Sequence, residues 1–497
     1  MLRFSPNQNL ARLIRWFESE DDAFATAEAQ DRPVALFLGA FWCRYCQRMD
    51  EEAFSDRENM ALLNAYFVAL RVENAKRPDI DARYNLNGWP TIAFLSPNGK
   101  LLAAANYLPA AEFKELLLNV YMEYQQCKEE LRVDHSGASA GPPVPQPSRR
   151  PPALSSVNEI TDSIMAAADH DNGGYGRGQK FIHPEVNEFL LCRYEQTHDE
   201  RLLEHVRLTL ERMRGGAMYD DSEGGYFRTT TGADWVQPHR EKLLIEQAGL
   251  VLNCIHLFRI TGNESHARMG EEIIGYLDRK LFASEKPAFF GCEDFLRDET
   301  SSPNEFFTII DECIYTDANS VAVIAYLDAA AVLKRPEYQE QALKILEFLW
   351  HRNRDEEYGM FHYFDNAPQI PGLLIDQARM GIALARAFAA TGDDRFLDRA
   401  TKLADIVLSR QACAQGGYFD RGPSELGFFG PRLILIDQNG LAASFFLMLA
   451  GATNEPKYRD AAIDAFKAFP GDFSSYGIHA ALLGQALGEW ETMEELE

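Results

Sequence analysis

Two cysteines near the start of the chain have the spacing of a reactive pair. They are Cys43 and Cys46 in "GAFWCRYCQRMDEEAF", where an apolar run precedes the motif and helix-forming residues follow it. A Cys-x-x-Cys pair can cycle between dithiol and disulfide, supply half of a zinc site, or fill a core with two small apolar side chains. The motif alone leaves these three possibilities open.

Four acids recur at matching places further along the chain. Each is the second residue of one of four similar stretches, "IEQAGLVLN", "TDANSVAVI", "IDQARMGIA" and "IDQNGLAAS": Glu246, Asp317, Asp376 and Asp437. Paired carboxyl groups can transfer protons to and from a sugar or hydrolyse a glycosidic bond. A single acid in the first turn of a helix is also explained by helix capping. Capping does not call for an acid inside an otherwise apolar helix, and this favours a shared site.

The elements around the cysteine pair alternate between strand and helix. The run "RPVALFLGA", residues 32–40, is continuously apolar, which is typical of a central strand buried on both faces. Residues 67–74 and 91–100 are two further strand candidates, and an amphipathic helix follows them. The pattern predicts a mixed α/β domain over residues 1–130. The proline-rich segment after it cannot bury enough surface to fold, so we place a linker at residues 131–153.

Residues 154–497 are helical almost throughout and repeat with a period near 60, since the four acids are 71, 59 and 61 residues apart. Uniformly apolar helices alternate with amphipathic ones, which predicts an inner ring shielded by an outer layer. Six such hairpins can close into an (α/α)6 toroid. The predicted inner helices are 184–197, 241–260, 316–333, 374–390, 437–451 and 476–490, and the outer ones are 155–169, 200–213, 264–280, 336–350, 394–409 and 456–468.

Long loops lead into the inner helices, so the four acids should meet at the long-loop face of the barrel. The same face gathers further polar and aromatic residues, namely Tyr175, His183, Tyr226, Trp235, His239, Glu241 and Gln438. Aromatic rings stack on sugars, and carboxylates and amides bond to hydroxyls. We expect His239, Glu246 and Asp317 to be catalytic and the others, with Asp376 and Asp437, to bind substrate. The Gly-Gly-Tyr stretches also predict turns with positive φ and an inward aromatic ring.

The composition limits the partners and the compartment. A net charge of −26 argues against nucleic acid and anionic membranes, because both require basic patches. The apolar run at 440–452 is too short to span a membrane, and the first residues show no signal peptide. Eight scattered cysteines indicate a reducing, cytoplasmic location. The sequence has no HExxH motif, second CxxC motif or glycine-rich phosphate loop, so we expect no metal and no cofactor.

Long compound motifs in both halves resemble one known family. "RPVALFLGAFWCRYCQRMDEEAFSD" and "RPDIDARYNLNGWPTIAFLSPNGK" resemble the thioredoxin-like domain of the YyaL / spermatogenesis-associated thioredoxin-like family, and "DNGGYGRGQKFIHP" and "EGGYFRTTTGADWVQPHREKLLIEQAGL" resemble its barrel motifs. The resemblance covers essentially the whole chain. It implies a thioredoxin fold joined to a six-hairpin domain similar to N-acylglucosamine 2-epimerases and glycoside hydrolases. The family's Cys-His-x-Cys is here Cys-Arg-Tyr-Cys, and its "PHFEKMLYDQA" is here "PHREKLLIEQA".

The implied thioredoxin fold gives roles to the residues around the cysteine pair. Cys43 becomes the exposed nucleophile at a helix N-terminus, and Cys46 becomes the resolving thiol one turn later. Trp89 and Pro90 form a cis-proline loop that faces the pair and contacts a protein thiol substrate. The strand before the motif lacks the buried acid that assists the inner cysteine in thioredoxins.

Three hypotheses follow for the whole chain. The first is acid/base chemistry on a small carbohydrate in the barrel, either epimerisation beside a carbonyl or glycoside hydrolysis. The second is a non-catalytic barrel that binds a glycan or a protein, with the thioredoxin-like part as a docking module. The third makes the front domain the enzyme, acting on a protein disulfide held by the barrel. A filled, apolar barrel centre would exclude the first hypothesis.

Overall fold

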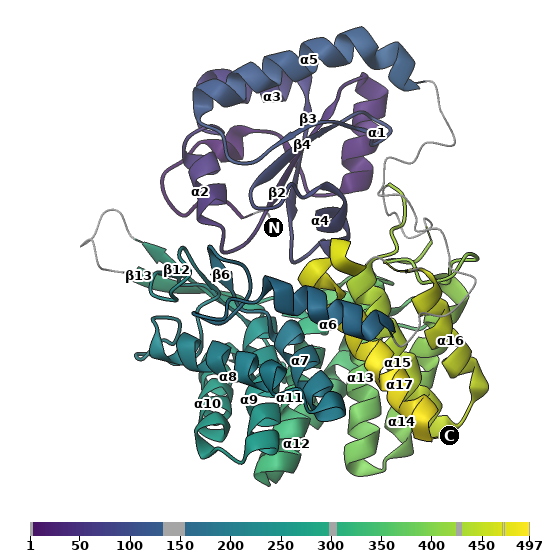
Figure 1. The fold of residues 1–497 in the computed structure, drawn as a ribbon. Coiled ribbons are helices and arrows are strands. Elements are labelled where there is room, and N and C mark those ends of the chain that lie inside the picture. The colour runs from purple at the N-terminus through teal and green to yellow at the C-terminus, as the bar shows by residue number, and fades with distance from the viewer. Residues whose placement is uncertain are drawn as a thin grey trace. The chain divides into compact units, whose positions relative to one another are not determined.

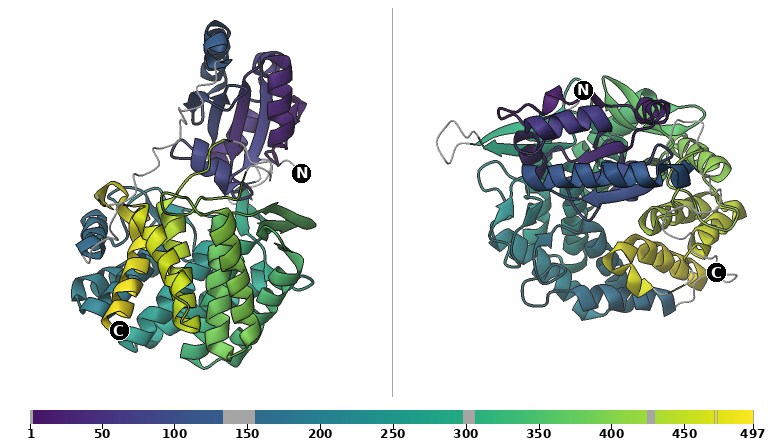
Figure 2. Two further views of the ribbon diagram at one scale, coloured as in Figure 1. Left: turned by 90° about the vertical axis from the view of Figure 1, so that its right-hand side faces the viewer. Right: turned by 90° about the horizontal axis from the view of Figure 1, so that it is seen from above.

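The computed structural model describes residues 3–132, 155–297, 306–423, 430–469, 471 and 473–496 (Figures 1 and 2). The chain divides into two compact units. The first holds residues 1–144, 296–307 and 423–433, and the second holds 145–295, 308–422 and 434–497. Most of the predicted linker, 131–153, lies outside the described residues, so its boundaries stay a prediction.

The first unit is built on a five-stranded mixed sheet in the order β1-β3-β2-β4-β5. The central strand β2 pairs in parallel with β3 and antiparallel with β4, and β4 and β5 form a hairpin. All six residues of β2 are buried, as its continuous apolar sequence predicted. The strands are β1 (Trp16–Phe17), β2 (Val34–Gly39), β3 (Val68–Glu73), β4 (Thr91–Leu95) and β5 (Leu101–Ala105).

Two hydrophobic cores cover the faces of this sheet. One gathers Phe37 and Phe94 with residues of α2, α3 and α5, and the other gathers Leu36 and Leu38 with residues of α1 and α4. Alternation along β2 sends successive side chains into opposite cores. The helices are α1 (Glu20–Gln30), α2 (Arg44–Glu51), α3 (Arg57–Tyr66), α4 (Pro78–Tyr84) and α5 (Ala110–Arg132).

Within the described residues, the second unit contains a closed ring of six inner helices. Each inner helix packs against the next along the chain, and α17 packs against α7 to close the ring. The inner helices are α7 (Pro184–Thr197), α9 (Leu244–Thr261), α11 (Thr316–Leu333), α13 (Leu374–Thr391), α15 (Ile436–Thr453) and α17 (Ala481–Leu496). Helix α11 has the length and apolarity of a membrane span, and its place in the ring, with 67% of it buried, accounts for this.

Six outer helices cover the ring, one on each inner helix. Helix α6 packs on α17, so the sixth hairpin joins the first and the last helices of the unit. The outer helices are α6 (Ser155–Ala167), α8 (Glu200–Gly215), α10 (Glu264–Tyr276), α12 (Pro336–Arg352), α14 (Asp394–Arg410) and α16 (Pro456–Lys467). Every predicted helix of the toroid is present, and the largest difference in bounds is at α17, predicted at 476–490 and observed at Ala481–Leu496.

Short turns join the inner to the outer helices, as predicted. Each inner helix from α7 to α15 ends at a residue with a left-handed conformation, such as Gly262 at φ 67°. In four turns a threonine completes the connection. Thr261 is one, since its hydroxyl donates to the Leu257 carbonyl (2.7 Å) and accepts from the Asn263 N–H (3.2 Å).

The long loops contain short antiparallel strands that the sequence interpretation missed. Strand β16 reads "GMFHYFD", and its residues alternate between buried and half-buried, as in a strand that covers one face of a layer. Helix-period patterns dominate the surrounding sequence and hide these short runs. The strands are β6 (Lys180–Phe181), β7 (Thr229–Thr230), β8 (Pro238–His239), β9 (Lys242–Leu243), β10 (Phe282–Ala283), β11 (Ala288–Phe289), β12 (Cys292–Arg297), β13 (Phe306–Asp311), β14 (Ile314–Tyr315), β15 (Arg354–Asp355), β16 (Gly359–Asp365) and β17 (Ala367–Pro371).

Candidate functional site

The Gly-Gly-Tyr stretches form tight turns beside the inner helices. Gly224 and Gly225 both have positive φ, 83° and 77°, and a Cβ at Gly225 would lie 2.8 Å from the Tyr276 ring. Tyr226, which follows them, is 1% exposed. The predicted turn geometry with an inward aromatic ring is therefore confirmed, and glycine is required by both conformation and space.

An amide on an inner helix closes the Gly-Gly-Tyr turns at Tyr226 and Tyr418, and two further long loops are held in the same way. Gln247 accepts a hydrogen bond from the Tyr226 N–H (2.8 Å) and donates to the Tyr226 carbonyl (2.7 Å). Asn439 binds both backbone groups of Tyr418 in the same way (2.7 and 2.9 Å). Gln377 does so with Met360, and Asn319 with Phe289. The amides of the repeated motif thus fix the loops, and we call this arrangement the amide clamp.

The acids of the repeated motif lie in the first turns of four inner helices. Glu246 begins α9, Asp317 begins α11, Asp376 begins α13 and Asp437 begins α15. Since all inner helices start at the long-loop face, the four acids share the mouth of the barrel, as the sequence predicted. The four acids have different neighbouring charges, so their pKa values and the reactions they can support also differ.

Glu246 is a nearly buried acid beside a cation. Its side chain is 15% exposed, and its Oε1 lies 3.7 Å from Nε of Arg228. The Arg228 guanidinium also lies 3.7 Å from Oε1 of Glu241, which is 6% exposed. Burial raises the pKa of Glu246 to about 8, although Arg228 opposes the shift. Glu246 therefore holds a proton at neutral pH.

Asp317 and Asp376 lie near a histidine that the sequence interpretation missed. His362 of β16 has Nδ1 at 3.0 and 3.1 Å from the two carboxylate oxygens of Asp376, and donor atoms of Asp317, His362 and Asp376 all lie within 4.8 Å of one another. Asp376 and His362 are buried, whereas Asp317 is half-buried. Burial raises the pKa of Asp376 to about 6, against the effect of His362. The three residues form a cluster in which His362 is hydrogen-bonded to Asp376, and Asp317 is the most accessible of the three.

Two further histidines lie within electrostatic range at the mouth. His183 caps the start of α7, and His479 precedes α17. Burial lowers the pKa of His183 to about 4, helped by the charges of His479 and Arg228. Burial raises the pKa of Asp437, which His479 opposes. The N-terminal ends of the inner helices thus bring acids and bases of differing proton affinity together.

Several predicted substrate-binding residues have structural roles instead. Trp235 is 1% exposed, and its indole N–H donates to the Asn172 carbonyl (2.8 Å), so its ring presents no face to a sugar. Tyr175 is buried with its hydroxyl bonded to Asn187 (2.9 Å), and Tyr226 is buried in its turn. These three predictions are wrong because large aromatic rings in the loops gain more by packing onto the helices than by facing the mouth.

The other predicted barrel residues remain near the mouth without a demonstrated role. His239 lies in the rim strand β8, paired with Thr229 of β7, and is half-buried. Gln438 is 8% exposed, next to the clamp residue Asn439. Their part in binding or catalysis stays a prediction.

The barrel centre is hollow. A cavity of about 410 Å³ lies between the inner helices, and all six contribute to its lining. That volume falls within the range of small-molecule sites. Its walls mix apolar residues with charged ones, including Glu185 and Arg379, which form an ion pair of 3.2 Å. The described helices therefore do not form a filled, apolar centre, which would have excluded carbohydrate chemistry.

The cysteine pair caps a helix in the first unit, as predicted. Cys43 is the N-cap of α2, its sulfur accepts a hydrogen bond from the Cys46 N–H (3.0 Å), and the two cysteines form a disulfide. The Trp89–Pro90 bond is cis, and the Trp89 ring meets the Trp42 ring at 5.3 Å. Cys43 is 5% exposed and Cys46 is 4% exposed, so the prediction of an exposed Cys43 is wrong. It belongs to the hydrophobic core cluster against which Trp42 and Trp89 pack.

A buried ion pair lies further along the same helix. Strand β2 has no acid, as predicted, but Asp50, one turn after Cys46 on α2, is 1% exposed. Arg71 of β3 binds both of its carboxylate oxygens (2.8 and 2.9 Å) and stacks over Phe37. The buried acid near the cysteine pair is therefore on helix α2, and the sequence interpretation, which considered only the strand, missed it.

Comparison with known proteins agrees with both halves of this description. Residues 6–139 match the Thioredox_DsbH domain family, described as "Protein of unknown function, DUF255". Human spermatogenesis-associated protein 20 is 27% identical over 305 residues, which cover 56% of this chain and 39% of that protein. The chain thus spans well under half the length of this relative. The thiol:disulfide interchange protein DsbD of Yersinia pestis is 32% identical over 127 residues, 24% of this chain and 19% of that protein.

Solved structures resemble the second unit. A D-mannose isomerase superimposes with a TM-score of 0.55 at 12% identity, covering 69% of this chain and 99% of its own. Cellobiose 2-epimerase from Spirochaeta thermophila gives 0.54 at 14% identity, covering 68% and 97%. At such identities the likeness is one of fold. The chain therefore matches the Thioredox_DsbH domain over residues 6–139, and its second unit has the (α/α)6 fold that these two solved structures share.

Proposed function

We propose that the barrel is a carbohydrate-active enzyme of the epimerase or isomerase type, which moves a proton at a carbon beside a sugar carbonyl. The observation that carries the proposal is the cluster of Asp317, His362 and Asp376 at the mouth, together with the contact between Glu246 and Arg228. The fold shared with a D-mannose isomerase and a cellobiose 2-epimerase supports it.

The two groups suit opposite halves of such a reaction. Asp317, the most accessible residue of its cluster, takes a proton from the carbon, and the nearby His362–Asp376 pair stabilises the charge change. Glu246, protonated at neutral pH, supplies a proton on the other side. Arg228 offers positive charge where the sugar oxygen becomes negative.

The test is solvent exchange. The full chain is incubated in D₂O with aldoses, ketoses and disaccharides, and deuterium at the carbon beside the carbonyl is measured by NMR. We expect incorporation by the wild type and a loss of roughly 10²–10⁴-fold in Asp317→Asn, as is usual for a proton-transfer group. Glu264→Gln, an exposed first-turn acid of α10, serves as the control.

Each other outcome has a definite meaning. If the protein cleaves the disaccharides and incorporates no deuterium, the proposed epimerisation is wrong and the reaction is glycoside hydrolysis. Binding detected by thermal shift without any turnover would favour the non-catalytic barrel. Equal incorporation by Asp317→Asn and wild type would refute the role of Asp317 as the base.

A second activity is favoured by the geometry of the cysteine pair. The N-cap position of Cys43 and its hydrogen bond from the Cys46 N–H suit a stabilised thiolate, as in thiol–disulfide oxidoreductases. The full chain, reduced beforehand, should reduce a model protein disulfide, and Cys43→Ser should not. Equally poor reduction by both proteins would remove this activity from the proposal.

A further inference from the structure

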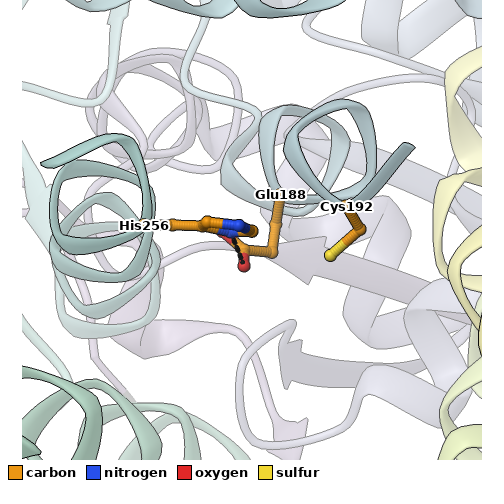
Figure 3. A group of neighbouring side chains, drawn as sticks. All are labelled: Glu188, Cys192 and His256. Carbon is orange, nitrogen blue, oxygen red and sulfur yellow. Dashed lines mark hydrogen bonds and ion pairs between the residues drawn. The ribbon is translucent and has the colours of Figure 1, made fainter. Parts of the chain in front are cut away.

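Three different metal-binding side chains converge inside the barrel cavity. They are Glu188 and Cys192 of α7 and His256 of α9, and Figure 3 shows them pointing toward one another. Their donor atoms lie within 4.8 Å of one another, and His256 Nδ1 is 2.7 Å from Glu188 Oε1. None of the three is among the acids at the mouth.

The two helices hold these side chains on facing surfaces. Glu188 and Cys192 are four residues apart, so they occupy one face of α7 a single turn apart. Helix α9 is the neighbour of α7 in the ring, and His256 faces α7 from it. All three residues line the cavity of about 410 Å³, which leaves room for a further ligand beside them.

The cluster also has the outer contacts that metal ligands require. The second nitrogen of His256, Nε2, lies 3.1 Å from a carboxylate oxygen of Glu195, and Glu195 is held in turn by Arg259 (2.9 Å). The second oxygen of Glu188 accepts from the Asn253 amide (3.1 Å). A carboxylate on the far nitrogen of a histidine fixes the ring and its tautomer at many metal sites.

The charges around the cavity leave the cluster without an arginine of its own. Arg379 pairs with Glu185, Arg386 with Asp328, and Arg259 with Glu195. Glu188 is paired with His256 instead. Among the described residues, a cation in the cluster would therefore meet an acid that forms no direct ion pair with an arginine, and Arg386 acts on Glu188 only at longer range.

We propose that Glu188, Cys192 and His256 form a three-ligand site for a zinc-type divalent cation. Sulfur, nitrogen and carboxylate donors together suit zinc, whereas magnesium and calcium prefer oxygen alone. Zinc lies about 2.0–2.3 Å from such atoms, so ligands around it are roughly 3–4 Å apart, and small side-chain rotations bring the donors there. The fourth position faces the cavity, as at zinc sites with three protein ligands. This proposal does not depend on the sugar chemistry above.

The test uses cobalt as a spectroscopic probe for zinc. The full chain carries Cys43→Ser and Cys46→Ser, so that the other cysteine pair contributes no thiolate. We expect one equivalent of Co²⁺ to bind with a near-ultraviolet thiolate-to-cobalt absorption band, and Zn²⁺ to displace it. Cys192→Ser should abolish the band, whereas Cys413→Ser, which removes a half-buried thiol outside the cavity lining, should leave it unchanged.

A second variant separates metal binding from folding. Glu195→Gln keeps all three ligands and alters the outer contact of His256 together with the ion pair to Arg259, so it should weaken cobalt binding by about 10–100-fold. Circular dichroism checks that each variant is folded. No stoichiometric binding, or a band that survives Cys192→Ser, would overturn the proposal and leave a hydrogen-bonded Glu–His–Glu network. A band seen only when Cys43 and Cys46 are present would assign the ion to that pair.

Discussion

Replacing Glu246 with glutamine should stabilise the protein, and increasingly so as the pH rises. The acid sits in a site where burial raises its pKa from 4.5 to about 8. The folded protein therefore holds a proton that the unfolded chain releases. Stability from this group is fully present below about pH 4.5 and is lost as the pH rises through about 8. Glutamine keeps the shape of the protonated acid and has no such loss.

The size of the effect follows from the pKa difference, at about 1.4 kcal/mol for each unit. At about pH 5 the wild type and Glu246→Gln should differ by less than ~1 kcal/mol. At pH 7 the variant should be more stable by about 3 kcal/mol, and above pH 8 by about 5 kcal/mol. The side chain is 15% exposed, so little solvent screening reduces these values.

Urea unfolding of the full chain, followed by tryptophan fluorescence between about pH 5 and pH 9, measures the difference. The control is Glu264→Gln, which also removes a first-turn acid but from an exposed position on α10. Its effect should be small, ~0.3–1 kcal/mol, and flat with pH. A constant difference for Glu246→Gln, or a variant that is less stable throughout, would refute the assignment of a protonated, buried acid.

Two other substitutions test the amide clamp of the barrel and the buried ion pair beside the cysteine pair. Asn439→Ala should destabilise the barrel by about 2–4 kcal/mol in urea unfolding, because the Tyr418 N–H and carbonyl lose their partners. The neighbouring Gln438→Ala, whose Oε1 has no hydrogen-bond partner in the described structure, should cost less, and equal costs would argue against the amide clamp. Asp50→Ala should cost about 3–5 kcal/mol because it leaves the Arg71 guanidinium buried without its carboxylate. An unchanged urea midpoint would show that water reaches Arg71.

The helical framework was predictable because its signal is periodic. Alternating apolar and amphipathic helices, separated by turn residues, repeat often enough to predict two layers and six hairpins. The central strand β2 was predictable because all its residues are apolar. These patterns arise from the burial of many side chains together, so no single residue decides the prediction.

The site was less predictable because it depends on single side chains brought together by loops. His362 lies in a strand that the helical pattern hides, and no local motif links it to Asp317 or Asp376. Trp235 was misplaced because an aromatic residue in a long loop can either face a ligand or pack onto a helix, and sequence does not separate the two. His256 lies 64 residues after Cys192, well beyond the spacing of any short metal motif.

Closure of the ring has a consequence for how the barrel folds during synthesis. Helix α7 is completed against α17, where Gln196 donates to the Gly488 carbonyl across 292 residues of chain. The flank of α7, and α6 beside it, therefore stay uncovered until α17 leaves the ribosome. Such long-range closure folds slowly and exposes apolar surface to aggregation. Nascent chains of this protein should accordingly depend on chaperones most strongly just before α17 emerges.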